Sequence, residues 1–171
     1  MLSKLQSENK VLSIDFEELI REFHPMMYKI CRVYASDEDF DDLYQEVLIS
    51  LWKSYSTFKG DSKLSTWVYR VVLNTALTYH RNEKRAKSKF GWFVDKIPDA
   101  IEEIPVPPKN QVEKLYQAIG QLPKLDRSVV LLYLEEKTYD EISEIMGITP
   151  TNVGVKINRI KKRLLKILKT I

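Results

Sequence analysis

The chain has 171 residues, of which 44% are hydrophobic and 30% are charged, and its formal net charge is +3. This composition is typical of a soluble globular protein and excludes a low-complexity chain, and the length allows one medium-sized domain or two small ones. The single cysteine, Cys31, excludes an internal disulfide and is expected in the core. Neither His24 nor His80 has a Cys or His neighbour at ligand spacing, so we expect no metal site and no cofactor.

The N-terminus lacks the long apolar segment of a signal peptide. The longest apolar run, Val129 to Leu134, is far too short to span a bilayer. We therefore expect a cytoplasmic protein without membrane insertion. The distribution of charge along the chain is more informative about binding partners than the small net charge, because local electric fields steer partners.

Two helices are predicted before residue 56. From Ile14, apolar residues recur at helical spacing, which predicts a helix to about residue 35 that Pro25 breaks or kinks. After a turn crowded with acids, a second helix is predicted from about Asp41 to Tyr55, with acids in the first turn, where the helix dipole favours them. The expected buried stripe of this second helix contains Leu43, Val47, Leu48, Leu51, Trp52 and Tyr55.

A third helix is predicted from Thr66 to about Lys87, after a loop in which Gly60 and Asp61 supply the turn. Ser65 is expected to cap this helix. Its core-facing residues are expected to be Trp67, Val68, Val71, Val72, Thr75, Ala76 and Tyr79. Its other faces are expected to carry Tyr69, Arg70, Asn74, Arg81, Lys84 and Arg85.

Residues 89–109 change character, because several prolines and a group of acids interrupt the helical pattern, and this predicts a linker. A helix is predicted from Val112 to Leu122 and ends at Pro123. Asp126 is expected to cap the following helix, which contains the apolar run Val129 to Leu134.

The stretch from Thr138 to Leu165 predicts a helix–turn–helix. Gly147 directly follows a helical pattern, where a helix can end at positive φ, and Thr149 and Pro150 supply an N-cap and a first helical residue. The second helix is expected to bury Val153, Ile157, Ile160 and Leu164. Its other faces are expected to carry Thr151, Asn152, Asn158, Arg159, Lys161, Lys162 and Arg163. Such a basic helix fits a DNA major groove, and the alternative is a surface hairpin with a solvated basic face.

Every predicted element is a helix, and no clear run of period-two alternation is present. The predicted fold class is therefore all-α, with two small helical domains joined by a proline-containing linker. The domains are predicted at residues 1–88 and 110–171, and the linker at residues 89–109. Each domain has enough aromatic and aliphatic residues for a core of three or four helices.

Nothing in the sequence indicates catalysis. It contains no Gly-rich phosphate loop, no metal cluster and no nucleophile–base pair at a spacing that indicates nucleophilic catalysis. Asp41 and Asp42 are paired carboxylates, but adjacent residues point to different sides of a helix, which indicates a charged surface rather than an acid/base pair. We therefore expect that the protein is not an enzyme.

An acidic cluster surrounds the start of the second helix. Gln45 and Ile49 continue an exposed stripe beyond Asp41 and Asp42. A mixed acidic, polar and apolar face suits a basic partner surface. The alternative is a solvated helix start, where acids are common because of the helix dipole.

A second group, from Phe58 to Arg85, combines aromatic and basic residues. Aromatic rings stack on unpaired bases, and cations follow the phosphates, so the group suits nucleic acid. The alternative assigns Trp67 and Tyr79 to the core and the cations to solvent.

Taken together, these residues resemble a sigma factor of the extracytoplasmic-function (ECF) group of the sigma-seventy family, bacterial subunits that give RNA polymerase its promoter specificity. The resemblance extends from about Ile14 to Leu168. The region-two signature is DFDDLYQEVLISLWKSYSTF followed by FKGDSKLSTWVYRVVLNTALTYHRNEKR, and the region-four signature is LPKLDRSVVLLYLEEKTYDEISEIMGITPTNVGVKINRIKKRL. The resemblance implies a factor that binds core RNA polymerase, directs it to promoter DNA and assists promoter melting.

The resemblance also implies roles for particular residues. Those expected on a coiled coil of the polymerase β′ subunit are Asp41, Asp42, Gln45, Glu46 and Ile49. Those expected on the minus-ten element, including a loop that captures a flipped base, are Phe58, Lys59, Gly60, Asp61, Ser62, Lys63, Arg70, Asn74, Arg81, Lys84 and Arg85. Those expected on the minus-thirty-five duplex are Thr151, Asn152, Gly154, Val155, Lys156, Asn158, Arg159 and Lys162. The polymerase β subunit is a further implied partner, and the sequence leaves open whether an anti-sigma factor binds.

Gly154 and Val155 depart from the family pattern, in which a basic residue and a serine are common at these places. Glycine inside a helix costs roughly 1 kcal/mol relative to alanine, and Val155 can contact a thymine methyl group. We therefore expect DNA binding with an unusual sequence preference. A stand-alone helix–turn–helix regulator is the alternative function, and a helical protein–protein adaptor without a nucleic-acid role is a third.

Overall fold

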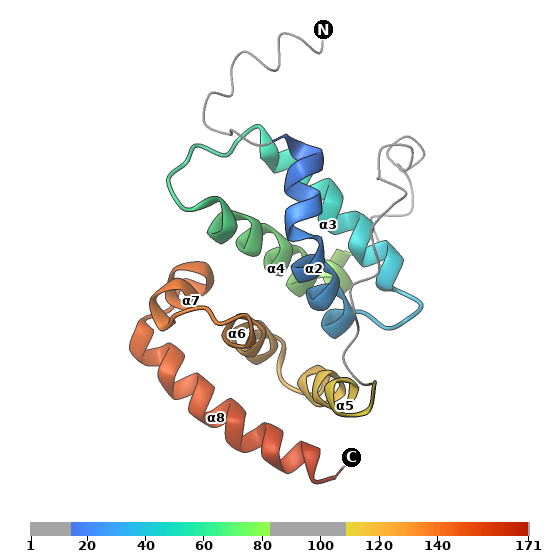
Figure 1. Ribbon diagram of the computed structural model, residues 1–171, viewed down its shortest axis with the longest axis vertical. Helices are drawn as coiled ribbons and strands as arrows, with labels where there is room; N and C mark the ends of the chain where they lie inside the picture. Colours follow the sequence, from blue (N-terminus) through green and yellow to red (C-terminus); the bar gives the residue numbers. More distant parts are fainter. Residues whose placement is uncertain (1–14, 83–108, 171) are drawn as a thin grey trace, which may run out of the picture.

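The computed structural model describes residues 15–82 and 109–170, and every regular element in these two ranges is a helix, which confirms the all-α fold class. The helices are α2 (Phe16–Tyr34), α3 (Phe40–Tyr55), α4 (Leu64–Asn82), α5 (Lys109–Gly120), α6 (Lys124–Leu134), α7 (Tyr139–Met146) and α8 (Pro150–Leu168). The N-terminal helices, α2–α4, form the upper part of Figure 1, and the C-terminal helices, α5–α8, form the lower part. No helix in the two ranges is both long and apolar enough to cross a membrane.

Helix α3 packs against both α2 and α4, and it contributes the fully buried Leu43, Val47 and Leu51. Helix α2 begins where the Asp15 side chain accepts a hydrogen bond of 2.8 Å from the backbone N–H of Phe16. It continues without a break through Pro25 to Tyr34, which confirms the predicted helix to about residue 35. Burial of the neighbouring methionines outweighs the one backbone hydrogen bond that a proline removes from a helix.

Helix α6 lies at the centre of the molecule, between α8 and the N-terminal helices. All four residues from Val129 to Leu132 are buried, so α6 has no solvent-facing side over this stretch. A helix that is apolar around its whole circumference is surrounded by other elements. Helix α8 lies across α5, α6 and α7, and it buries the predicted residues Val153, Ile157, Ile160 and Leu164.

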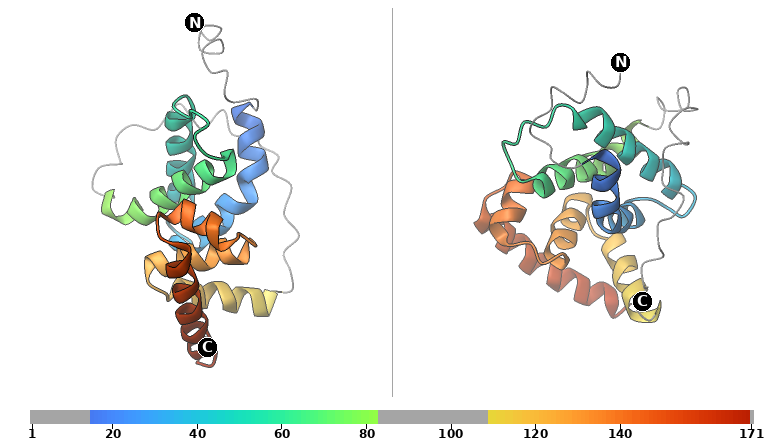
Figure 2. Two further views of the ribbon diagram at one scale, coloured as in Figure 1. Left: turned by 90° about the vertical axis from the view of Figure 1, so that its left-hand side faces the viewer. Right: turned by 45° about the horizontal axis from the view of Figure 1, so that its top comes forward.

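One hydrophobic core runs through both groups of helices. Helix α4 contacts α6 and α7, and α2 contacts α5 and α6. The two groups of helices therefore lie side by side (Figures 1 and 2). The division into residues 1–88, 89–109 and 110–171 stays a prediction. Within the predicted linker, only Lys109 lies in the described ranges, as the first residue of α5.

Helix α6 begins earlier than predicted. Its first residue is Lys124, with Pro123 at the N-cap position, so Asp126 lies in the first turn and does not cap the helix. The Asp126 carboxylate instead pairs with Lys156 Nζ at 3.0 Å and with Arg163 Nη1 at 3.5 Å. Attraction to two cations of α8 therefore replaces the capping role that the sequence suggested.

Helix α4 also begins earlier than predicted, at Leu64, so Ser65 lies inside the helix. Two aromatic residues lie on unexpected faces: Trp52 is 40% exposed, whereas Tyr69 is only 5% exposed. Trp52 packs edge-to-face on Phe16, with 4.9 Å between ring centroids. Tyr69 is buried because the C-terminal helices cover its face of α4, an arrangement between distant segments that a local pattern does not encode.

Candidate nucleic-acid and polymerase interfaces

The start of α7 is fixed by local hydrogen bonds. The Thr138 hydroxyl accepts from the Glu141 backbone N–H at 3.2 Å, and the Glu141 carboxylate accepts from the Thr138 backbone N–H at 3.0 Å. These bonds from the backbone and side chain of Thr138 favour the ionised carboxylate and hold the pKa of Glu141 below its ordinary value.

The predicted end of α7 and start of α8 are both confirmed. Gly147 follows α7 at φ +66°, in the left-handed region, and its N–H bonds to the Ser143 carbonyl. The Thr149 hydroxyl then accepts from the Asn152 N–H at 3.3 Å, with Pro150 as the first residue of α8. The helix–turn–helix geometry thus follows from residues close together in the chain.

Helix α8 presents one anchored face and one open face. Val153, Ile157 and Ile160 lie in the core. The exposed residues that the sequence assigned to the minus-thirty-five duplex are Thr151, Asn152, Val155, Asn158, Arg159 and Lys162. A helix held rigidly on one side, with polar, apolar and basic groups on the other, can enter a major groove and contact base edges.

Two other residues assigned to the duplex lie at the flanks of α8. A Cβ atom built at Gly154 would lie 3.3 Å from Cε2 of Tyr139, so the glycine lets the Tyr139 ring close onto α8. Lys156 points to α6, where it pairs with Asp126. Sequence reasoning missed Tyr139 and Asp126 as supports of α8, because both act between helices. The glycine itself, unusual inside a helix, was the one signal of a close approach.

The residues assigned to the β′ subunit differ strongly in exposure. Asp41 and Asp42, at the start of α3, are exposed, and Gln45 and Glu46 are half-buried. Ile49 is only 5% exposed, so the predicted exposed stripe ends before it. The buried stripe of α3 is wider than predicted here, because Val47, Leu48 and Ile49 are all buried.

The loop between α3 and α4 combines exposed residues with one buried aromatic residue. Phe58 is 8% exposed and packs on Trp67, with 5.1 Å between ring centroids. Gly60 has φ +79°, which forms the predicted turn. The exposed residues of this loop are Lys59, Gly60, Asp61 and Lys63, and Ser62 is half-buried. Stacking of Phe58 on a base would require the ring to leave Trp67.

Two cations assigned to the minus-ten element contact α7. Nε and Nη2 of Arg70 both donate to the Glu144 carbonyl oxygen, at 3.2 and 2.6 Å. Nζ of Lys63 lies 3.6 Å from Oε1 of Glu141. In this structure, both cations are therefore engaged by the C-terminal helices.

The other residues assigned to the minus-ten element follow Arg70 along the chain. Asn74 is exposed and lies one turn beyond Arg70, on the same side of α4. Arg81 belongs to the last turn of α4. Lys84 and Arg85 lie outside the described residues.

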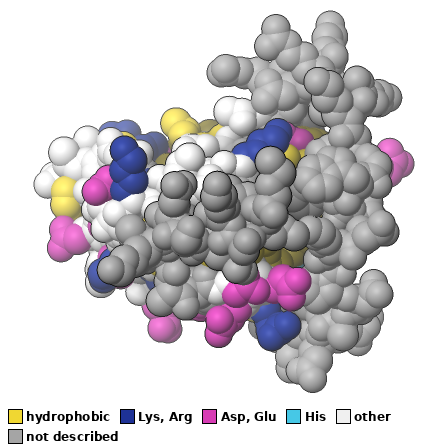
Figure 3. Space-filling model, turned by 90° about the horizontal axis from the view of Figure 1, so that it is seen from above, with side chains coloured by type: hydrophobic (Ala, Val, Ile, Leu, Met, Phe, Trp, Pro, Cys, Tyr) yellow, Lys and Arg dark blue, Asp and Glu magenta, His cyan; other side chains and the backbone are white. Residues whose placement is uncertain are grey.

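Charge is distributed unevenly over the surface. In the view from above, acidic side chains gather along one edge of the described surface (Figure 3).

Across residues 15–82 and 109–170, no group of three or more His, Cys, Asp or Glu side chains could hold a metal ion. Cys31 is fully buried, as predicted, and burial raises the pKa of its thiol to about 12.

The helix–turn–helix with its open basic face is the arrangement of a DNA-binding protein, and the start of α3 is a separate acidic surface. Residues 19–86 match the family model for Sigma-70 region 2, and residues 112–164 match the model for Sigma-70, region 4. The chain therefore belongs to the sigma-70 family, in its ECF group, and is a transcription initiation factor rather than an enzyme.

Curated relatives span most of the chain. The ECF RNA polymerase sigma-E factor of Haemophilus influenzae is 24% identical over 160 residues, which cover 87% of this chain and 85% of the relative. The ECF RNA polymerase sigma factor SigW of Bacillus subtilis is 26% identical over 171 residues, which cover 90% of this chain and 89% of the relative.

Solved structures share the fold. The sigma factor RpoE of Bartonella quintana, in complex with the anti-sigma factor NepR, has a TM-score of 0.67 at 19% identity, covering 91% of this chain and 97% of that one. CnrH, in complex with the cytosolic domain of CnrY, also has a TM-score of 0.67, at 16% identity, covering 97% of this chain and 95% of that one.

Proposed function

We propose that this sigma factor divides its work between its two helical groups. Residues 1–88 would bind core polymerase, recognise the minus-ten element and assist melting, and residues 110–171 would read the minus-thirty-five duplex. The observation that supports this division is the placement of two open surfaces on different groups. One is the outer face of α8, and the other is the start of α3, where Asp41 and Asp42 are exposed.

The acidic start of α3 suits a basic partner. Asp41 and Asp42 stand at the helix N-terminus with their carboxylates in water, so they can attract a basic surface over a distance and fix the orientation of docking. We assign this contact to the β′ subunit and a further contact to the β subunit, in the cytoplasm. The solved structure of RpoE in complex with the anti-sigma factor NepR makes an anti-sigma factor a further candidate partner of this chain.

The outer face of α8 suits a duplex. Arg159 can contact a guanine edge or a phosphate, and Asn158 can pair with an adenine edge. Val155 is 43% exposed and can contact a thymine methyl group. Because Gly154 and Lys156 lie at the flanks, the preference for sequence would depend on Thr151, Val155, Asn158 and Arg159.

A charge-reversal experiment tests the proposed division. Selection of promoter sequences bound by core polymerase with this chain supplies a template, and run-off transcription then measures activity. The double variant Asp42→Lys, Glu46→Lys should bind core polymerase about tenfold or more weakly, because the acidic face becomes basic. Its affinity for duplex minus-thirty-five DNA should stay the same.

The matched control is the double variant Glu17→Lys, Glu18→Lys, which makes the same charge change at the exposed start of α2. This control should retain polymerase binding and transcription. Wild-type chain that forms no stable complex with core polymerase would overturn the proposed function and favour a stand-alone regulator. Binding insensitive to salt would favour a protein–protein adaptor, because phosphate contacts weaken steeply as salt rises.

A further inference from the structure

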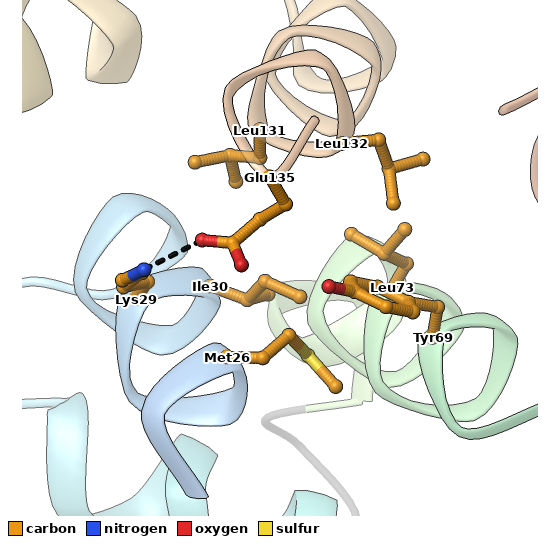
Figure 4. Close-up of a pocket in the computed structure, with 8 residues that line it drawn as sticks. All are labelled: Met26, Lys29, Ile30, Tyr69, Leu73, Leu131, Leu132 and Glu135. Carbon is orange, nitrogen blue, oxygen red and sulfur yellow. Dashed lines mark hydrogen bonds and ion pairs between the residues drawn. The ribbon is translucent and has the colours of Figure 1, made fainter. Parts of the chain in front are cut away.

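A pocket between α2, α4 and α6 is too small for a ligand. Its volume is ≈ 10 Å³, at the lower limit for a single water molecule, and the apolar Met26, Leu73 and Leu131 line much of it (Figure 4). The two charged residues that line it, Lys29 and Glu135, pair with each other at 2.6 Å. The outer side of α8, in contrast, is open to a partner of any size.

The last turns of α8 carry a dense run of cations. Five of the nine residues from Lys161 to Lys169 are Lys or Arg, and no Asp or Glu occurs from Pro150 to Ile171. A surface that serves only solubility usually carries charges of both signs. The members of this run differ in what they contact, and the difference separates structural cations from free ones.

Two cations of the run hold α8 on α6. Lys161 Nζ donates to the Tyr133 hydroxyl at 2.9 Å and lies 4.5 Å from the centroid of that ring. Arg163 Nη1 lies 3.5 Å from Oδ2 of Asp126, which also pairs with Lys156. These side chains are therefore committed to contacts within the fold.

The other three cations of the run lie on the outer side of α8. Lys162, Lys166 and Lys169 are exposed, and no ion pair or side-chain hydrogen bond engages them within residues 15–82 and 109–170. Val155 precedes Lys162 by seven residues, so spacings of seven, four and three residues place all four on one side of the helix. Lys166 and Lys169, here called the basic extension, therefore continue the open face beyond the residues assigned to the minus-thirty-five duplex.

The basic extension lies on a firmly held part of the helix. On the opposite side, Ile160 and Leu164 are buried and Ile167 packs against the core. At the end of the helix, the Thr170 hydroxyl donates to the Lys166 carbonyl at 3.1 Å, and the Thr170 N–H donates to the Ile167 carbonyl at 2.9 Å. Because the backbone is already fixed, only the lysine side chains have to be ordered when a partner binds.

Helix α8 is longer than a major groove is wide. From Thr151 to Lys169 it extends about 27 Å at about 1.5 Å per residue, whereas the groove is about 12 Å wide. Since the groove also curves around the duplex, a rod of this length cannot lie inside it throughout. When the first turns contact base edges, the last turns therefore lie beside phosphates, as the end of a homeodomain recognition helix does.

The residues assigned to the minus-thirty-five duplex supply few free cations. Gly154 has no side chain, and Lys156 is held by Asp126. Arg159 and Lys162 are thus the exposed cations of that set. Phosphate contacts supply a large share of DNA affinity. A helix with few of them in its first turns gains much from cations further along.

The helix dipole does not account for the basic extension. It favours cations in the last turn, where Lys166 and Lys169 lie. However, it does not select one side of the helix, and it does not exclude acids from the earlier turns. A partner with many negative charges accounts for both features.

We propose that the basic extension binds phosphates of the duplex beside the minus-thirty-five element and lengthens the contact of this chain with promoter DNA. The inference rests on the proposed function, because α8 has to read that duplex through its first turns. DNA is favoured over an acidic protein, because the extension continues the side of α8 that carries Val155 and Lys162. Phosphate contacts carry no sequence information, so the extension raises affinity for every sequence alike.

Salt dependence tests the basic extension in the full chain. Fluorescence anisotropy measures binding of a selected minus-thirty-five duplex with flanking sequence, and of a scrambled duplex, over a range of salt. The double variant Lys166→Gln, Lys169→Gln should weaken binding to both duplexes by the same factor, about tenfold at low salt. The slope of log affinity against log salt should become shallower by about 1.8, or about 0.9 for each lost phosphate contact.

Two matched variants separate charge from structure. Lys166→Arg, Lys169→Arg keeps both charges and should retain the affinity and the slope. Arg21→Gln, Lys53→Gln removes two charges at exposed positions of the N-terminal helices and should also behave as wild type. Circular dichroism should show unchanged helix content in every variant, because all four positions are exposed.

The length of the duplex tests where the basic extension binds. A duplex that ends at the minus-thirty-five element lacks the flanking phosphates. Adding about ten base pairs, one helical turn, should tighten binding of the wild-type chain when they are added on the side that α8 reaches. The Lys166→Gln, Lys169→Gln variant should gain nothing from either addition.

Three results would overturn the basic extension. An equal slope in wild type and the glutamine variant would show that no phosphate contact is lost. An equal loss in Arg21→Gln, Lys53→Gln would assign the effect to net charge. Normal duplex binding with reduced run-off transcription would assign Lys166 and Lys169 to an acidic protein partner instead.

These outcomes are separable from the proposed function. Wild-type chain that directs core polymerase to the selected promoter, while the glutamine variant binds the duplex equally well, refutes only the basic extension. Wild-type chain that shows no preference for the selected duplex refutes the proposed role of α8 itself.

Discussion

The two surfaces assigned to DNA differ in what covers them. The outer face of α8 is open, with Arg159 and Val155 exposed above a buried row of aliphatic residues. The corresponding side of α4 is engaged, because Arg70 donates to α7 and Phe58 packs under the loop on Trp67. Major-groove contacts need only a rigid open helix, whereas capture of an extruded base needs a site that opens. If both surfaces bind DNA as proposed, the free chain should bind duplex DNA through α8 before α4 is available.

Two arginine substitutions test this contrast most strongly. In the free chain, Arg159→Ala should weaken binding to a selected minus-thirty-five duplex by about 1–3 kcal/mol, the range for a good base contact. Arg70→Ala should leave that affinity unchanged, because Arg70 bonds to α7 in the free chain. Fluorescence anisotropy with the selected duplex and a scrambled one measures both effects. Equal losses for the two variants, or none for Arg159→Ala, would contradict the contrast.

The helices themselves were largely predictable, because their signals are local. Gly147 and Thr149 marked the turn between α7 and α8 correctly, since a left-handed residue and an N-cap depend on neighbours within a few positions. The burial of Tyr69 was not predictable, because it results from α6 and α7 packing on α4. Asp126 was misjudged for the same reason, since its partners lie on α8.

A variant without the N-cap of α7 tests how much the local hydrogen bonds of the helix–turn–helix stabilise the chain. Thr138→Ala should lower the free energy of unfolding by about 0.5–2 kcal/mol, because a helix cap is lost. It should also change the pH dependence. The pKa of Glu141 is lowered in the folded chain, so its stabilising contribution is present above the unfolded pKa and is lost as pH falls through the folded pKa. Thr138→Ala removes the hydroxyl but keeps the backbone N–H that contributes most to this lowered pKa, so it should flatten the loss of stability on the acid side only in part.

Thr149→Ala is the matched variant, because Thr149 caps α8 through the Asn152 N–H. Denaturant unfolding at a series of pH values should show a similar loss of stability at neutral pH for both variants. Only Thr138→Ala should alter the acid-side slope. An identical slope in wild type and both variants would show that the Thr138 hydroxyl does not perturb the Glu141 carboxylate in solution.

The candidate site was less predictable than the fold. The candidate surfaces were located from residue types, because acids, cations and a basic helix can be recognised in the sequence, and their roles remain predictions from the family resemblance. The contacts of individual side chains were not readable, and Ile49, Phe58 and Lys156 are all less accessible than their sequence roles implied. Each is covered or held by a neighbour that depends on how the helices pack.

Gly154 gives the smallest expected effect and the finest test of how α8 is supported. Alanine is favoured over glycine inside a helix by roughly 1 kcal/mol. In this chain the new methyl carbon would meet the Tyr139 ring at 3.3 Å, and that ring is 42% exposed, so it can shift outward at modest cost. Gly154→Ala should therefore stabilise the chain by less than about 1 kcal/mol, and by close to the full roughly 1 kcal/mol when Tyr139→Ala is also present. Denaturant unfolding of the two single variants and the double variant gives the coupling. A chain destabilised by Gly154→Ala alone would instead show that Tyr139 is held firmly against α8, making the ring a fixed part of the support for the open face.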